Sequence, residues 1–130
     1  MTSSREITAA DEALLEAARG AASDAYAPYS KFLVGAAVRT REGRIITGAN
    51  VENAAYPLGV CAERTALASA ASQGIRPGDI DAAAITASPC GGCRQWLLEF
   101  RVERVIFEHD DGVEVHSAAE LLPRSFVLDA

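Results

Sequence analysis

Two of the three cysteines in this chain stand three positions apart in the stretch SPCGGCRQ, directly after a proline. Side chains at positions i and i+3 of an α-helix lie on one face, so Cys90 and Cys93 would share a metal ion if a helix begins here. The positive end of the helix dipole favours the thiolate, which is the form of cysteine that binds metal. The spacing therefore predicts two ligands of one metal ion at the start of a helix.

The remaining cysteine, Cys61, begins a second predicted helix in the stretch VCAERTA. Catalytic zinc sites use three protein ligands, whereas structural zinc sites use four. A zinc ion with three protein ligands keeps one position for water, and the pKa of that water falls to about 7. We therefore expect Cys61, Cys90 and Cys93 to bind one Zn²⁺ per chain and to leave solvent in the fourth position.

Glu63 and Arg64 follow Cys61 at the same helix start. The carboxylate of Glu63 would point into the metal cavity, where it could take a proton from bound water and return it to a substrate. Three thiolates give the zinc site a net negative charge, which weakens the ion as a Lewis acid. We expect the Arg64 guanidinium to hydrogen-bond the sulfurs and offset this charge, with Arg94 or Gln95 orienting it. The alternative for both arginines is a solvated surface position.

Each part of this pattern also has a simpler interpretation. A CxxC pair alone occurs in redox motifs and in structural zinc sites, and CAE alone could be a buried cysteine beside a solvated glutamate. His109 and His116 lie around a late hairpin, away from both helix starts, and we expect them at the surface rather than on the metal. Taken together, CAE and PCGGC match the arrangement of ligands and proton carrier in zinc deaminases.

The metal site requires two helices to begin close together, and the apolar pattern of the chain predicts elements that can place them. Helices are predicted at 11–27 (capped by Thr8 or Asp11 and closed by Pro28), 61–72, 89–100 and 117–122, and strands at 33–40, 44–50, 80–86, 104–109 and 113–115. The first two strands form an antiparallel hairpin, and the later strands are linked through helices. This order implies a mixed sheet with helices on both faces, that is, an α/β layered domain.

Length, charge and hydropathy exclude several classes of function. A chain of 130 residues has the size of one domain, so we expect a single domain over residues 1–130. No run approaches the ~18 consecutive apolar residues of a membrane span. A formal net charge of -6 disfavours binding to nucleic acid. The start of the chain lacks the features of a secretory signal, and a disulfide framework is not expected from an odd number of cysteines. We therefore expect a cytoplasmic protein with a small-molecule partner and no membrane partner.

Four stretches carry a resemblance that goes beyond the metal motif: AYAPYSKFLVGAAV, TGANVENAAYPLGVCAERTAL, SPCGGCRQ and ELLPRSF. Through them the chain closely resembles the cytidine deaminase family, in particular its small, homotetrameric branch with three cysteine ligands. The likeness extends from about Tyr26 to Phe126. It implies a three-layer α/β/α fold with a mixed five-stranded sheet, and a homotetramer with shared active sites.

The resemblance also implies a reaction, the hydrolytic deamination of cytidine and 2'-deoxycytidine in pyrimidine salvage, with Glu63 as the proton shuttle. It places Asn50 and Glu52 on the ribose, Phe32 on the pyrimidine and the backbone of Ala62 on the base. The positions that would reach a neighbouring subunit's site are Ala54, Tyr56 and Phe126. From the residues alone, Asn50 and Glu52 could equally belong to an ordinary turn, and both phenylalanines would more often be core residues.

One departure from the family leaves alternatives open. The link AAAITASPC is shorter than in relatives, which could shorten a strand, alter the pocket wall or change subunit contacts, and Trp96 could fill the space so left. A deaminase for a modified cytosine nucleoside, such as blasticidin S, therefore remains an alternative. From another class, a non-catalytic zinc-binding domain is the second alternative, and the loss or retention of turnover in Glu63→Ala distinguishes it.

Overall fold

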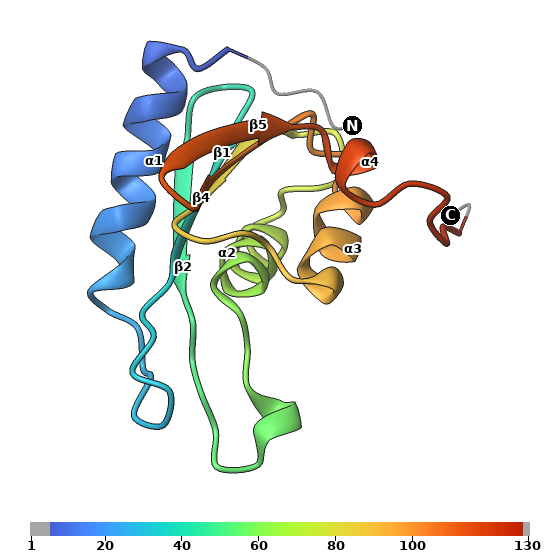
Figure 1. Cartoon of the computed structure of the whole chain (residues 1–130). Helices are drawn as coiled ribbons and strands as arrows, with labels where there is room; N and C mark the ends of the chain where they lie inside the picture. Colours follow the sequence, from blue (N-terminus) through green and yellow to red (C-terminus); the bar gives the residue numbers. More distant parts are fainter. Residues whose placement is uncertain (1–5, 129–130) are drawn as a thin grey trace.

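Five strands form one mixed sheet in the computed structural model, which describes residues 6–128 (Figure 1). The elements in chain order are α1 (Ala9–Ala22), β1 (Gly35–Thr40), β2 (Ile45–Ala49), the short 3-10 helix η1 (Tyr56–Leu58), α2 (Ala62–Ser72), β3 (Ile80–Ile85), α3 (Gly91–Glu99), β4 (Arg104–His109), β5 (Gly112–His116) and α4 (Ala118–Leu121). The strand order is β2-β1-β3-β4-β5. Neighbours pair antiparallel except β3 and β4, which are parallel and joined through α3.

Helices cover both faces of this sheet, as the element pattern predicts (Figure 1). On one face α1 buries Leu14, Leu15 and Ala18 against small residues of β1 and β3. On the other face α2, α3 and α4 enclose a larger core that includes Leu67, Ile85 and Leu97, together with residues from four strands. The three-layer α/β/α fold is confirmed, and the two helices that carry the cysteines lie side by side on one face.

Most predicted elements appear within two residues of their expected ends, but the first helix does not. It ends at Ala22, although the apolar spacing predicts it to continue to Ala27. The backbone of Tyr26 instead pairs with the chain just after β2: its N–H donates to Asn50 O at 2.9 Å, and its carbonyl accepts from Glu52 N–H at 2.8 Å. A tertiary bridge has replaced the last turn of the helix, and it holds the loop before β1 against the loop that leads to α2.

The shortened link between β3 and α3 is fastened to the sheet. Thr86 N–H donates to Gly35 O at 3.0 Å, and the Thr86 hydroxyl accepts from Gly35 N–H at 3.1 Å. Trp96 lies on α3 and is 36% exposed; that it fills space left by the shorter link stays a prediction, which unchanged thermal stability of Trp96→Val would contradict. None of the helices formed by residues 6–128 is long and apolar enough to cross a membrane. The predicted domain limits, 1 and 130, lie outside the described residues.

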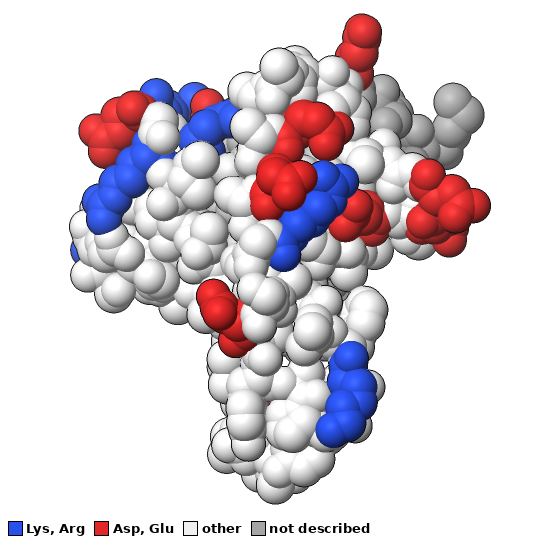
Figure 2. Space-filling view, turned by 90° about the vertical axis from the view of Figure 1, so that its left-hand side faces the viewer, with Lys and Arg blue, Asp and Glu red and all other residues white. Residues whose placement is uncertain are grey.

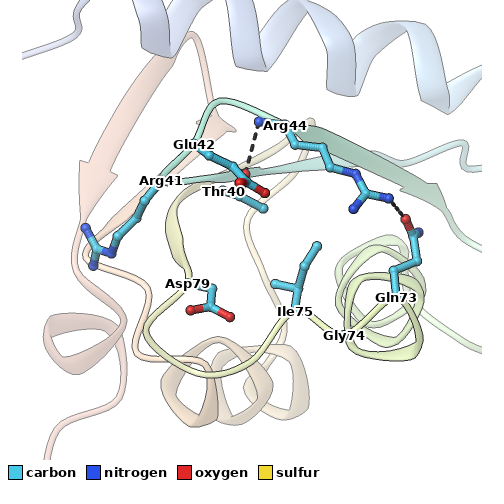
Figure 3. Close-up of a pocket in the computed structure, with 8 residues that line it drawn as sticks. All are labelled: Thr40, Arg41, Glu42, Arg44, Gln73, Gly74, Ile75 and Asp79. Carbon is cyan, nitrogen blue, oxygen red and sulfur yellow. Dashed lines mark hydrogen bonds between the residues drawn. The ribbon is translucent and has the colours of Figure 1, made fainter.

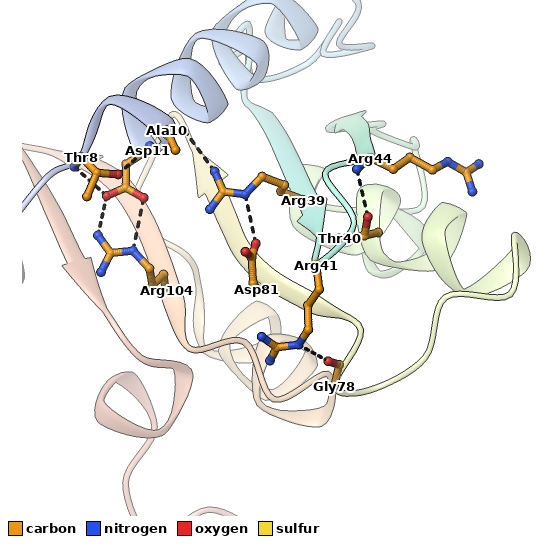
Figure 4. A network of polar contacts seen from close by, with 10 residues as sticks. All are labelled: Thr8, Ala10, Asp11, Arg39, Thr40, Arg41, Arg44, Gly78, Asp81 and Arg104. Carbon is orange, nitrogen blue, oxygen red and sulfur yellow. Dashed lines mark hydrogen bonds and ion pairs between the residues drawn. The ribbon is translucent and has the colours of Figure 1, made fainter.

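Arginine–carboxylate pairs tie the start of α1 to the sheet (Figure 4). Asp11 is fully buried, completes a capping box with Thr8 and accepts hydrogen bonds from Arg104 of β4. Beside it Arg39 of β1 donates to Asp81 of β3 at 3.0 Å and to Ala10 O of α1 at 3.2 Å. Burial alone would raise the pKa of the Asp11 carboxyl, but the hydrogen bonds from Arg104 and Thr8 outweigh it and hold that pKa below its usual value.

Replacing Asp11 with asparagine is expected to lower the free energy of unfolding at pH 7 by about 1–3 kcal/mol, because a buried charged hydrogen bond is lost. A carboxyl whose pKa is lowered in the folded state stabilises the protein above its unfolded pKa and loses that effect as the pH falls through the folded value. The difference between Asp11→Asn and wild type should therefore shrink below about pH 4. Urea unfolding at several pH values checks this. Glu16→Gln, on an exposed pair with Arg19, is the control and should change stability by less than about 0.5 kcal/mol.

Candidate metal and catalytic site

Three sulfurs meet where two helices begin. Cys61 is the N-cap residue of α2, Cys90 is the N-cap residue of α3, and Cys93 lies in the first turn of α3. The Cys61 and Cys90 sulfurs are 3.9 Å apart, those of Cys90 and Cys93 are 3.4 Å apart, and all three lie within 4.8 Å of one another. Zn–S bonds of about 2.3 Å at tetrahedral angles require sulfurs about 3.8 Å apart. The donor set and its spacing fit one zinc ion.

The thiols differ in how readily they ionise. Burial raises the pKa of the Cys61 and Cys93 thiols, and the nearby Glu63 carboxylate raises both further. Burial acts in the same direction on Cys90, but hydrogen bonds from Cys93 and Arg64 outweigh it and lower the Cys90 pKa. A metal ion must therefore displace protons from Cys61 and Cys93, so its apparent affinity should rise with pH.

Glu63 lies in the first turn of α2 and is only 5% exposed. Burial raises the pKa of its carboxyl, against the opposing effects of its own backbone N–H, the Cys93 side chain and the charge of Arg64. A carboxyl whose pKa is raised toward neutrality can both accept and return a proton during a reaction. Glu63 thus combines the position and the environment of a proton carrier beside the sulfurs.

Arg64 lies against the sulfur cluster. Interaction of its guanidinium with Cys93 and Cys90 raises the pKa of Arg64 above its usual value, while the Arg64 Nε is buried without a hydrogen-bond partner. The structure places Arg64 beside the sulfurs, and its role in offsetting the charge of three thiolates stays a prediction. Sequence reasoning missed Gly92, where an added Cβ would lie 2.9 Å from Arg64 Nη2. The double glycine in PCGGC was the available signal.

Arg94 and Gln95 do not take the orienting role that the sequence suggests. The Arg94 guanidinium donates to Pro89 O at 2.9 Å and Leu121 O at 3.1 Å, so it fastens the link before α3 and the end of α4. Gln95 Nε2 donates to Phe126 O at 2.8 Å and ties the C-terminal segment to α3. For Gln95 the reason is helical geometry: it follows Cys93 by two positions and therefore lies about 200° around the helix from it.

Asn50 and Glu52 brace the loop before β1. The Asn50 side chain accepts from Val34 N–H at 2.8 Å and donates to Phe32 O at 2.9 Å. Glu52 Oε1 accepts from the N–H groups of Tyr29 and Ser30 at 2.9 and 3.1 Å. The hydrogen bonds from Ser30 lower the pKa of the Glu52 carboxyl, so it remains ionised near neutral pH. These contacts fix the segment that carries Phe32; the role of both residues toward a ribose stays a prediction.

The remaining predicted binding residues fall into two groups. Ala62 is buried at the start of α2, where its N–H has no partner within the helix. Phe32, Ala54, Tyr56 and Phe126 are exposed, with Phe32 at 61% and Tyr56 at 89%. The simpler interpretation of the two phenylalanines as core residues is therefore wrong. Ala54 and Tyr56 belong to the long β2–α2 loop, which extends away from the sheet (Figure 1).

The two histidines lie away from the sulfurs, as expected, but one of them is not at the surface. His116 is 1% exposed, because it pairs opposite Val105 in the β4–β5 ladder. Its side chain therefore lies on the same face of the sheet as Val105, which belongs to the core beneath α2 and α3. Its Nε2 lies 2.9 Å from Glu114 Oε1, and its ring lies beside Phe107. Neither His116 nor His109 belongs to the cysteine cluster.

A separate hollow of about 370 Å³ lies at the other end of α2 (Figure 3). It is bordered by the β1–β2 turn and by Gln73, Gly74 and Asp79. Arg44 donates to Gln73 and Arg41 to Gly78 O, so its arginines are engaged by the protein itself. The hollow lies at the opposite end of α2 from Cys61, and the helix between them is roughly 16 Å long. It is not part of the metal site.

Comparison with known proteins places this geometry in a family. A family model described as the cytidine and deoxycytidylate deaminase zinc-binding region matches residues 8–109. The chain is 40% identical over 124 residues to a cytidine deaminase of Sporosarcina psychrophila, covering 88% of this chain and 90% of that protein. It is 42% identical over 125 residues to a cytidine deaminase of Halalkalibacterium halodurans, covering 89% and 93%. The crystal structure of cytidine deaminase from Burkholderia pseudomallei is similar with a TM-score of 0.83 at 45% identity, covering 92% of this chain and 100% of that one.

Proposed function

The chain belongs to the cytidine and deoxycytidylate deaminase family, and we propose that it hydrolyses cytidine and 2'-deoxycytidine to uridine and 2'-deoxyuridine with release of ammonia. One observation carries this conclusion: three sulfurs at zinc spacing lie beside the buried carboxyl of Glu63. A structural zinc site would need a fourth protein ligand and has no use for a buried proton carrier. Among residues 6–128 no further histidine, cysteine or acidic side chain joins the three cysteines, which would leave one position for the reacting water.

The residues of the chain divide the work of the reaction. Cys61, Cys90 and Cys93 would hold zinc, which supplies the acidity that makes water a nucleophile at neutral pH. Glu63 takes one proton from that water and passes it to the ring nitrogen beside C4 as the C–O bond forms. It passes the second proton to the amino group, which leaves as ammonia when the C–N bond breaks, so the atoms balance. Arg64 keeps the charge of the sulfurs from weakening the zinc ion.

The loop that Asn50 and Glu52 brace would hold the nucleoside. Phe32 would offer its exposed ring to the pyrimidine, where stacking adds affinity without selecting hydrogen bonds. The Ala62 N–H, at the start of α2, would bind the base. Asn50 and Glu52 would hydrogen-bond the ribose hydroxyls from the same side of the pocket.

Glu52→Gln is expected to raise the KM for cytidine about tenfold with little change in kcat, because a charged hydrogen bond to a hydroxyl becomes a neutral one. Glutamine can still accept from Tyr29 and Ser30, so the loop should stay in place. Steady-state kinetics in the ultraviolet measure this, with Glu42→Gln, in the distant β1–β2 turn, as the control. An unchanged KM in Glu52→Gln would remove Glu52 from the sugar site.

We further propose that four copies assemble and that Ala54, Tyr56 and Phe126 complete a neighbour's site. The support is their exposure, together with that of other apolar side chains nearby, including Tyr29, Leu58 and Val127. Charged side chains are sparse on the lower part of the molecule in Figure 2, where the loop before β1 and the β2–α2 loop extend. Light scattering should give four times the 13.7 kDa mass of the chain.

A cytoplasmic location is proposed from the three free thiols, which suit a reducing compartment.

The activity is tested by following the absorbance of cytidine with purified, zinc-analysed protein. The proposal predicts turnover of cytidine and 2'-deoxycytidine in excess of turnover of blasticidin S. Preferred turnover of blasticidin S would assign the site to a modified nucleoside. A zinc-loaded protein without turnover of any of these would make it a binding domain.

A further inference from the structure

Gly48 lies in β2 at the point where α2 rests on the sheet. A Cβ atom added at Gly48 would lie 2.5 Å from Ala66 N, 2.8 Å from Ala62 O and 3.0 Å from Ala66 Cα. All three are backbone atoms of α2, so no side chain can turn aside to make room. The backbone of Gly48 does not have a positive φ, and glycine is therefore required here for space alone.

The helix that packs against Gly48 is α2, which begins at Cys61 and carries Glu63 and Arg64. Ala62, one of the two residues in contact, stands between Cys61 and Glu63, whereas Cys90 and Cys93 belong to α3. An ordinary contact begins at 3.4 Å, so a Cβ at position 48 would have to move the α2 backbone by 0.6 Å (3.4 minus 2.8 Å) to 0.9 Å (3.4 minus 2.5 Å). Metal sites keep their ligand distances to within about 0.2 Å. A shift of this size would change the distance from Cys61 to Cys90 and Cys93 by more than a zinc site tolerates.

We propose that Gly48 is a positioning residue for the zinc site: its missing side chain sets the depth of α2 on the sheet and so the distance from Cys61 to Cys90 and Cys93. The inference rests on the proposed function, in that it takes the three cysteines as zinc ligands. Gly48 itself touches neither metal nor substrate. Its effect passes through the first turn of α2.

The chain offers a matched control on the opposite face of the sheet. Gly35 in the neighbouring strand β1 is also buried, and a Cβ there would lie 1.9 Å from Ala18 O and 2.5 Å from Ala22 N. Those atoms belong to α1, which carries none of the cysteines, nor Glu63 or Arg64. Gly35→Ala therefore creates a more severe clash with a helix backbone, but the helix that it displaces is not part of the site.

The test compares zinc release from Gly48→Ala, Gly35→Ala and wild type to a colorimetric chelator, with urea unfolding of each protein alongside. Gly48→Ala is expected to release zinc about 10- to 100-fold faster than wild type. Gly35→Ala should release it within about twofold of the wild-type rate, even if its loss of stability is as large. Release from Gly48→Ala at the wild-type rate, or equal acceleration in both variants, would overturn the inference.

A second pair keeps the inference testable if Gly48→Ala does not fold. Ala66→Val adds bulk at the same contact from the side of α2, and Ala18→Val does so on α1; both alanines are fully buried. Only Ala66→Val should accelerate zinc release. Wild-type protein that binds no zinc would overturn both this inference and the proposed function. A zinc-containing, active wild type with a Gly48→Ala variant of normal release would overturn the positioning role alone.

Discussion

Glu63→Gln is expected to lower kcat for cytidine by about 10²- to 10⁴-fold while zinc stays bound. Glutamine keeps the shape of the side chain but can neither accept the proton of the attacking water nor return it. The effect should fall on kcat and kcat/KM together, because proton transfer occurs after the nucleoside has bound. The raised pKa of the buried Glu63 carboxyl is consistent with a group that changes its protonation during each turnover.

Steady-state kinetics with zinc analysis of the same samples measure the effect. Glu99→Gln, at the exposed end of α3, is the control and should keep wild-type rates. A Glu63→Gln protein with full zinc and wild-type turnover would remove the proton carrier from the account. Loss of zinc along with activity would instead assign Glu63 to the stability of the metal site.

Cys93→Ala is expected to leave the protein without stoichiometric zinc and with no measurable turnover, the largest effect of any single change. Cys93 is fully buried beside Arg64 and the Cys90 sulfur, so its removal leaves two ligands, too few to hold the ion. Since alanine suits a buried position, the variant should still fold, with lower stability because metal bound only to the folded state no longer contributes.

Zinc content, turnover and thermal unfolding of Cys93→Ala are compared with those of wild-type protein stripped of zinc by a chelator. Added zinc should restore activity to the stripped wild type and leave Cys93→Ala inactive. The three cysteines are the only ones in the chain, so a thiol reagent should titrate three thiols after stripping and far fewer before. A Cys93→Ala protein that holds one zinc per chain and turns over cytidine would contradict the ligand assignment.

The layered fold was predictable because local patterns and tertiary structure agree over most of the chain. The hairpin, the parallel pair across α3 and the caps at Thr8 and Ser117 follow from alternation, spacing and capping residues. The early end of α1 was not predictable from its apolar spacing, since it depends on a bridge from Tyr26 to a segment distant in sequence. The burial of His116 likewise follows from its register with β4, which the sequence does not state.

The chemistry of the site was predictable to the extent that it resides in residue type and helix start. Cysteine spacing placed all three sulfurs at N-termini, and the structure brings them together. Side-chain contacts between distant segments were harder to predict, because no local pattern gives the partner. Gln95 donates to the backbone of Phe126, and the Asn50 amide donates to the backbone of Phe32. The need for glycine at position 48 arises from a helix crossing a strand, and no local motif signals it.

The proposed activity and the expected effects of the substitutions all depend on one zinc ion held by three cysteine sulfurs with its fourth position open to solvent. X-ray absorption at the zinc edge of the purified protein measures this directly. Three sulfur scatterers at about 2.3 Å and one oxygen at about 2.0 Å are expected. Four protein ligands around zinc, or a coordination shell with fewer than three sulfurs, would contradict it.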